Sequence, residues 1–128
     1  MNRTLPSNLD AEASVLGGIY LRRSCLDLAP VAALEVEDFY VPAHQATFTA
    51  IRNLEVQAKP IDPVTVDAEL MRLGKSQAVG GLAFQASLAL HCPSEANVEE
   101  YARIVSGLAA DAQVLGALKR LVALGRDA

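Results

Sequence analysis

The sequence has few aromatic residues from which a core could be built. Among its 128 residues are three Tyr, three Phe and no Trp, although 52% of all residues are hydrophobic. The core of a domain of this size must therefore consist mostly of Leu, Val and Ala. Because Ala is the best helix former, this composition favours helices over strands. The fold class that the sequence indicates is all-α.

The chain also lacks a basic face. Its 11 Lys and Arg are outnumbered by 15 Asp and Glu, and the formal net charge is -4. Neighbouring basic residues occur only as the pairs Arg22–Arg23 and Lys119–Arg120. Tight binding to nucleic acid requires clustered positive charge. We therefore expect any contact of this segment with DNA to be local and weak.

No targeting or membrane-spanning segment is recognisable. Asp10 and Glu12 interrupt the early apolar region, which excludes a signal peptide, and no continuous apolar run reaches about 18 residues. The cysteines Cys25 and Cys92 lie in apolar surroundings with no second pair nearby. We interpret them as two reduced, buried thiols, which is typical of a cytoplasmic protein.

Motifs for catalysis or for cofactor binding are missing as well. The chain has no Gly-x-x-x-x-Gly-Lys phosphate loop, and the pairs Gly17–Gly18 and Gly80–Gly81 lack the third glycine of a dinucleotide loop. His44 and His91 are not spaced as metal ligands, and His91 with Cys92 offers at most two ligands. We expect His44 to pack or to form a hydrogen bond. The residues thus predict no catalytic, cofactor or metal site, and indicate a helical interaction domain.

Apolar residues at helical spacing predict about five short helices in the first part of the chain. The predicted segments are residues 9–20, 25–34, 42–58, 63–73 and 82–90. Asn8 and Asp62 are placed to cap the first and fourth of them, and Gly74 to end the fourth. Residues 75–78 are expected to form a loop, and the apolar positions of 82–90 to be buried.

The pair Gly17–Gly18 lies inside the first predicted helix. Each glycine lowers helix stability by about 1 kcal/mol relative to alanine. A close contact with another backbone would compensate for this loss. We therefore expect a second segment to approach the first helix at this point.

The last helical pattern is too long for a small domain. It follows a turn at Pro93–Ser94 and begins near Asn97, with Glu100 at capping-box spacing. A helix of about 27 residues is about 40 Å long, which exceeds the ~26 Å diameter of a hundred-residue domain. Its apolar seam consists of Tyr101, Val105, Leu108, Ala112, Leu115 and Val122. We expect this seam to meet another helix, from the continuing chain or from a second chain; the alternative is that it folds back onto the same domain.

Ordered sequence blocks resemble the N-terminal domain of DnaB-type replicative DNA helicases of bacteria and phages. The opening block contains Leu9, Asp10, Ala11, Glu12, Ser14, Val15, Leu16, Gly17 and Gly18. Later blocks contain Asp38-Phe39-Tyr40 with His44 and Phe48, then Ile61, Asp62, Thr65, Val66 and Leu70. The last blocks contain Val79-Gly80-Gly81, Pro93-Ser94, Asn97, Tyr101-Ala102 and Ile104-Val105. Each block is weak alone, but they follow the order of the family from residue 6 to residue 105.

The resemblance implies a helical head followed by a helical hairpin. Residues 1–7 would be a flexible tail, 8–92 the head, and 93–128 the turn and first arm of the hairpin. In this family the hairpins pair between subunits, from dimer to hexamer, and the N-terminal domains form a collar that docks primase and, in some members, a helicase loader. The family's RecA-like motor, which binds ATP and Mg, is expected to lie outside this sequence.

Two other classes of protein stay open at this point. One is a standalone helicase adaptor, loader or inhibitor, or the helicase-binding domain of a primase, which shares this helical neighbourhood. The other is a small helical enzyme or ligand-binding protein, which would need a polar pocket around an acidic residue or His44.

Overall fold

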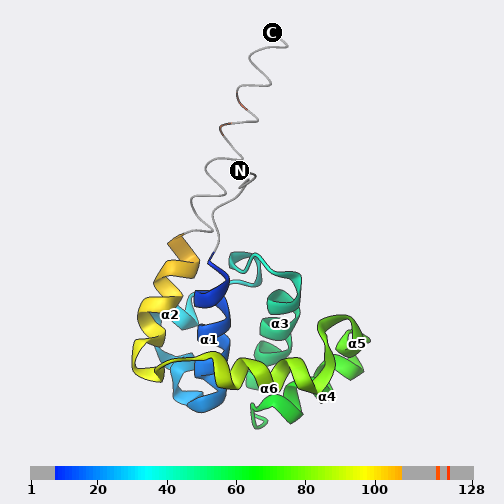
Figure 1. Cartoon of the computed structure of the whole chain (residues 1–128). Helices are drawn as coiled ribbons and strands as arrows, with labels where there is room; N and C mark the ends of the chain where they lie inside the picture. Colours follow the sequence, from blue (N-terminus) through cyan, green and yellow to red (C-terminus); the bar gives the residue numbers. More distant parts are fainter. Residues whose placement is uncertain (1–7, 108–117, 119–120, 122–128) are drawn as a thin grey trace.

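The chain folds into short helices packed around one central helix, α1 (Figure 1). The computed structural model describes residues 8–107 together with Leu118 and Leu121. The elements are α1 (Leu9–Leu21), η1 (Arg23–Asp27), α2 (Ala29–Ala32), η2 (Val36–Asp38), α3 (Pro42–Val56), α4 (Pro63–Arg72), α5 (Ser76–Val79), α6 (Gly81–His91) and η3 (Glu95–Asn97). Residues 98–107 are helical as well, and the described part of the chain contains no strand. The predicted all-α class is confirmed.

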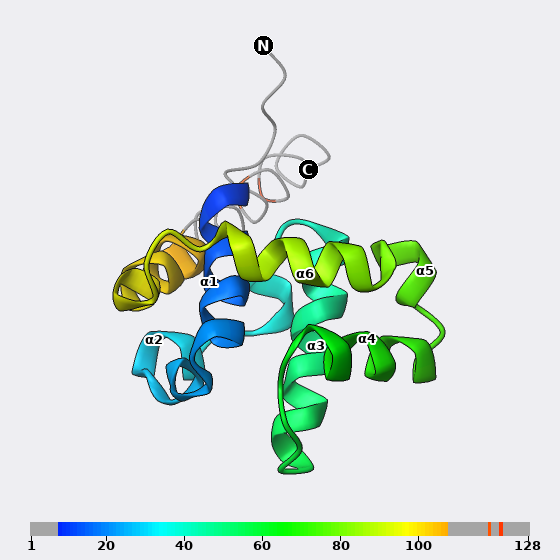
Figure 2. The ribbon, with the colours of Figure 1, turned by 60° about the horizontal axis from the view of Figure 1, so that its bottom comes forward.

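Helix α1 is buried on all its sides rather than on one face. Every residue from 11 to 19 is buried, although Leu9 at its start is 52% exposed. Helices α3 and α6 pack against it, and Figure 2 shows α6 crossing in front of it. A helix that is apolar all round needs cover on every side, and its neighbours provide this cover. None of the described helices is long and apolar enough to cross a membrane.

Local capping signals have the predicted effect at several helix ends. The Asn8 side chain accepts a hydrogen bond from the Ala11 N–H at 2.9 Å, which starts α1. Asp62 and Thr65 bond reciprocally at the start of α4, at 2.8 and 2.9 Å. Gly74 follows α4 with a φ of +75°, a conformation that glycine adopts without strain.

Two predicted segments differ in the structure. Residues 25–34 do not form one helix, but the short helices η1 and α2. The reason is Pro30, which lies in the first turn of α2 and has no N–H to donate, so the helix begins late. Residues 75–78 are not a loop, since α5 covers most of them; it ends at Val79 and is followed by Gly80, whose φ is +114°.

Helix α6 exists as predicted, but its leucines are not all buried. Leu82 is 46% exposed and Leu90 is 87% exposed, whereas Gln85 is fully buried with Leu88. The prediction that the apolar positions are buried is therefore wrong for Leu82, Ala86 and Leu90. The hydrogen bonds of Gln85 determine which side of α6 faces the core. The hydrophobicity of the sequence alone does not identify this side.

The junction before the last helical segment is capped by Ser94 rather than by Asn97. The Ser94 Oγ accepts a hydrogen bond from the Ala96 N–H at 3.3 Å, and Asn97 is itself the last residue of η3. Glu100 accepts a hydrogen bond from Arg103 at 3.2 Å, in the following turn. The predicted capping box of Asn97 and Glu100 is therefore not formed, because a 3-10 turn occupies the position of the cap.

Candidate functional site

The two glycines of α1 allow two later segments to approach it closely. A Cβ on Gly17 would overlap the carbonyl oxygen of Leu88 in α6, and a Cβ on Gly18 would overlap the side chain of Val98. The predicted close backbone contact is thus confirmed at Gly17. These contacts position both α6 and the segment 98–107 against the centre of the fold.

The first residues of the predicted seam pack inside the same domain. Of the seam residues, Val105 is 2% exposed and Tyr101 is half-buried against the core, and their neighbours Val98 and Ala102 are fully buried. The helix that follows residue 92 thus contributes to the core of the head. At Val105 the structure therefore agrees with the alternative that the seam folds back onto the same domain.

The rest of the seam lies beyond the described part of the chain. This applies to Leu108, Ala112, Leu115 and Val122, whose role stays a prediction. Two neighbours that are described, Leu118 and Leu121, are helical and are 53% and 64% exposed. Both side chains are available for burial against another helix.

A buried carboxylate joins α1 to the start of α3. Glu12 is 2% exposed, and its carboxylate accepts hydrogen bonds from the N–H groups of Tyr40 at 2.8 Å and Val41 at 3.3 Å. The Nδ1 of His44 lies 2.9 Å from Glu12 Oε1 and donates to it, since a carboxylate only accepts. Glu12 therefore caps α3 from another helix, and the hydrogen-bonding role predicted for His44 is confirmed.

A second buried network joins α1, α3 and α6. The Tyr20 hydroxyl donates to Gln85 Oε1 at 2.5 Å, and Gln85 Nε2 donates to Thr47 Oγ1 at 3.0 Å. Burial raises the pKa of the Tyr20 hydroxyl, and the nearby carboxylates of Asp62 and Asp67 add to this shift. The phenol therefore stays protonated and keeps its role as donor.

These polar groups join the helices of the head to one another. Among the described residues, every buried side-chain nitrogen or oxygen has a hydrogen-bond partner. The Nδ1 of His44 and both ends of the Gln85 amide are used within the two networks. The sequence did not reveal the roles of Glu12 and Gln85, since their partners are 28 or more residues away.

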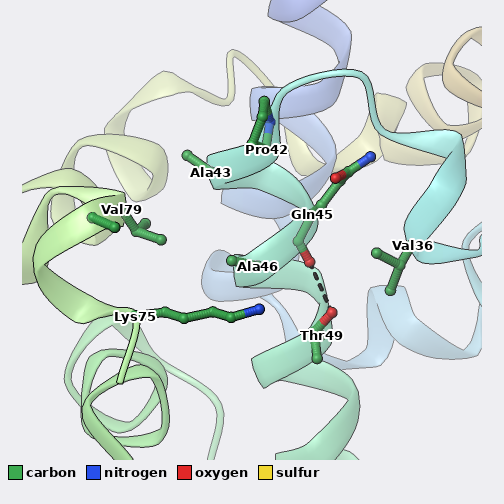
Figure 3. Close-up of a pocket in the computed structure, with 9 residues that line it drawn as sticks. Val36, Pro42, Ala43, Gln45, Ala46, Thr49, Lys75 and Val79 are labelled. Atoms are coloured by element: carbon green, nitrogen blue, oxygen red, sulfur yellow. Dashed lines mark hydrogen bonds between the residues drawn. The ribbon is translucent and has the colours of Figure 1, made fainter. Parts of the chain in front are cut away.

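A shallow pocket of about 400 Å³ lies beside α3 (Figure 3). It is lined by Val36, Pro42, Ala43, Gln45, Ala46, Thr49, Lys75, Ala78 and Val79. The Lys75 side chain extends toward Thr49, whose hydroxyl donates to the Gln45 carbonyl oxygen at 3.0 Å. A pocket with apolar walls and one ammonium group suits an apolar side chain that lies next to a carboxylate. Sequence reasoning missed this pocket because it is built from three separate segments.

Comparison with known proteins agrees with this architecture. Residues 4–107 match the family described as the DnaB-like helicase N terminal domain. The crystal structure of the N-terminal domain of DnaB helicase from Mycobacterium tuberculosis superposes with a TM-score of 0.90 at 37% identity. The match covers 96% of this chain and 88% of that one.

Curated relatives are considerably longer than this chain. The replicative DNA helicase DnaC of Bacillus subtilis (strain 168) is 38% identical over 104 residues, which are 81% of this chain and 23% of that protein. The replicative DNA helicase DnaB of Mycobacterium leprae (strain TN) is 38% identical over 123 residues, which are 96% of this chain and 20% of that protein. The chain therefore spans about a fifth of these relatives. Sequence and fold together show that it belongs to the family of DnaB-like helicase N-terminal domains.

Proposed function

We propose that this domain serves assembly and docking in a hexameric, ATP-dependent replicative DNA helicase. In this role it forms part of a collar between subunits and docks primase or a helicase loader, while ATP, Mg and the motor belong to another domain. Its relatives are named replicative DNA helicases, which supports the setting in DNA replication. The buried polar side chains of the described residues form hydrogen-bond networks that join its helices, as a docking module requires.

One observation carries the assembly role. The final helical segment is buried in the head at Val98, Ala102 and Val105, yet Leu118 and Leu121 further along are helical and exposed. Burying one leucine side chain contributes about 1.5–3 kcal/mol. A helix from a second subunit would provide this burial for the seam predicted at Leu108, Ala112, Leu115 and Val122.

Sedimentation equilibrium tests the assembly role. We expect the wild-type domain to associate, and Leu115→Asp or Leu118→Asp to shift it toward monomer, because a carboxylate cannot be buried in an apolar seam. Val64→Asp is the matched control, since Val64 is 64% exposed on α4 in the head. A strict monomer at high concentration, unchanged by Leu115→Asp, would contradict the proposal.

Calorimetric titration tests the docking role. Primase from the same organism is titrated into the wild-type domain, and we expect saturable binding with a stoichiometry that follows the association state. The absence of any heat or complex at concentrations above those of the sedimentation experiment would contradict docking, but would leave assembly untouched.

A further inference from the structure

The pocket beside α3 combines apolar walls with a single positive charge. Aliphatic side chains from η2, α3 and α5 form the walls, namely Val36, Pro42, Ala43, Ala46, Ala78 and Val79. Its volume of about 400 Å³ lies within the range of about 300–1,000 Å³ that is usual for ligand pockets. Among the described residues that line it, Lys75 is the only charged one.

The charge of Lys75 is not neutralised within the described part of the chain. None of the ion pairs between described residues includes Lys75. Figure 3 shows its side chain lying along the pocket toward Thr49. The ammonium group is therefore placed to meet a carboxylate that enters the pocket from outside.

The carboxylates on the neighbouring elements do not occupy this ammonium group. Asp67 accepts a hydrogen bond from the Ser76 hydroxyl at 2.6 Å, and Asp38 accepts one from the Glu35 N–H at 2.8 Å. Glu35 and Glu37 are exposed and are not among the residues that line the pocket. The lining itself thus carries a positive charge, although the chain as a whole has a net charge of -4.

The pocket also presents hydrogen-bond acceptors. The Gln45 Nε2 donates to the Phe39 carbonyl oxygen at 2.7 Å, and the Gln45 Oε1 receives no donor from the described residues. The Thr49 hydroxyl donates to the Gln45 carbonyl oxygen at 3.0 Å, so its own lone pairs can accept a hydrogen bond. A cation beside such acceptors suits a ligand that has both a carboxylate and N–H groups, as the end of a peptide chain does.

The carboxyl terminus of a peptide fits these features better than an internal acidic residue. In a C-terminal leucine, isoleucine or valine, the carboxylate and the apolar side chain are attached to the same Cα, so both can enter one pocket. In an extended internal segment, successive side chains point to opposite sides, so an acidic residue and its apolar neighbour do not enter together. Capture of a chain end is a recurring mode of peptide recognition.

We propose that this pocket binds the free carboxyl terminus of another protein chain that ends in an aliphatic residue. The carboxylate pairs with Lys75, the aliphatic side chain contacts the walls at Ala46 and Val79, and peptide N–H groups donate to Gln45 Oε1 or Thr49 Oγ1. Charge complementarity supports this occupant, since one carboxylate meets one cation next to apolar walls. None of the lining residues belongs to the seam, and the site does not depend on the proposed function.

The form of the pocket sets the strength of binding. It is shallow, and Lys75 is exposed, so the ion pair is partly screened by water. We expect a dissociation constant on the order of 0.1–1 mM for a short peptide. Binding should weaken further in about 1 M salt, where the screening length is about 3 Å.

Amide NMR of the domain tests the ligand. The probe is the peptide acetyl-Gly-Gly-Leu with a free carboxylate, and we expect saturable shifts centred on Ala46, Ala78 and Val79. The same peptide with a C-terminal amide should bind about fivefold more weakly, because it lacks the charge. Acetyl-Gly-Gly-Ser with a free carboxylate should also bind more weakly, because it lacks the aliphatic side chain.

Variants of the domain test the site. Lys75→Gln should weaken binding of the free-carboxylate peptide about fivefold and remove its advantage over the amide peptide. Lys59→Gln is the matched control, because Lys59 is also exposed but does not line the pocket, and it should leave binding unchanged. Ala78→Leu should weaken binding of both peptides, since it narrows the pocket from an exposed position that the core does not need.

Four outcomes would overturn this proposal. Three of them are the absence of saturable shifts at up to about 5 mM peptide, equal affinity for the acid and amide peptides, and equal effects of Lys75→Gln and Lys59→Gln. The fourth is tighter binding of acetyl-Leu-Asp-Gly amide than of acetyl-Gly-Gly-Leu, which would assign the pocket to an internal acidic segment. None of these outcomes bears on the proposed assembly role, which is measured by sedimentation of Leu115→Asp.

Discussion

Single residues in α1 decide how closely its neighbours pack. Gly17 and Gly18 give the space for the α6 backbone and for Val98, while Glu12 binds the start of α3. The glycines could be interpreted from the sequence, because a glycine pair in a helix is costly unless something approaches it. The role of Glu12 could not, since a carboxylate in the first turn of a helix is equally expected at the surface.

Replacing Gly17 by alanine should destabilise the domain by about 2–3 kcal/mol, because the new methyl group overlaps the Leu88 carbonyl oxygen and α6 must shift. Gly107→Ala is the matched control. Gly107 is helical with nothing within 4 Å of an added Cβ, so this change should be neutral or stabilise by up to about 1 kcal/mol. Urea unfolding measures both variants. Equal stability of the Gly17→Ala and Gly107→Ala variants would show that α6 shifts to make room for the methyl group at no cost.

Glu12→Gln should cost about 1–3 kcal/mol, because the amide NH₂ would face an N–H donor that the carboxylate now satisfies. The control is Asp10→Asn on the same helix, whose side chain is 90% exposed and should change stability by less than about 0.5 kcal/mol. Thermal unfolding at neutral pH compares them. A loss of stability of the same size in both variants would argue against the role of Glu12 as the cap of α3.

At the scale of elements, long polar side chains join helices that share little apolar surface. Arg52 on α3 donates to the carbonyl oxygens of Val31, Ala32 and Leu34 at 3.0–3.3 Å, which satisfies the C-terminal end of α2. Its guanidinium also lies 4.6 Å from the centre of the Phe48 ring. Because α2 has only four residues, these contacts explain how so short a helix is held.

Arg52→Lys should therefore destabilise the domain by about 1–2 kcal/mol, although the charge is kept. A single ammonium group cannot contact these carbonyl oxygens, pair with Glu55 as Nη1 does, and also lay a planar group over Phe48. Arg103→Lys, at a side chain that is 56% exposed, serves as control and should be nearly neutral. Chemical denaturation of both variants makes the comparison, and a neutral Arg52→Lys would mean that α2 is held by packing alone.

The contact between α3 and α4 depends on pH through Glu69. Hydrogen bonds from Arg72, and then from Asn53, lower the pKa of Glu69 to about 2. The pKa of an unfolded Glu is about 4.3. Since the folded value is the lower one, ionised Glu69 stabilises the domain above about pH 4.3, and this contribution is lost as the pH falls toward 2.

Glu69→Gln should therefore lose less stability than the wild type between about pH 5 and pH 2. Glu37→Gln, at an exposed position of η2, should follow the wild-type curve. Urea unfolding at a series of pH values gives the slopes. Parallel curves for the wild type and Glu69→Gln would show that the Glu69 contacts do not persist in solution.

At the scale of the whole molecule, α1 is the element on which the others depend. Its residues 11–19 are buried, and η1, α3 and α6 all contact it. Elements that are enclosed on every side open only when the whole fold opens.

Hydrogen exchange should therefore be slowest at the amides of residues 15–19, with protection close to the global free energy of unfolding. The amides of η1 and α2 should exchange faster, because these elements are short and lie at the surface. Mass spectrometry or NMR of the native domain provides the rates. Faster exchange in α1 than in α6 would place the stable centre elsewhere.

The sequence by itself determined the fold class, the helix caps at Asn8 and Asp62, the stop at Gly74 and the family. These depend on composition and on interactions within a few residues, which a sequence displays directly. Only the tertiary structure decided that Glu12 and Gln85 are buried partners, that Leu82 and Leu90 face outward, and that Val105 packs into the head. The physical reason is that burial of a side chain depends on which distant segments cover it. The residues next to a leucine or a glutamine in the sequence do not show whether its side of the helix is covered by another segment.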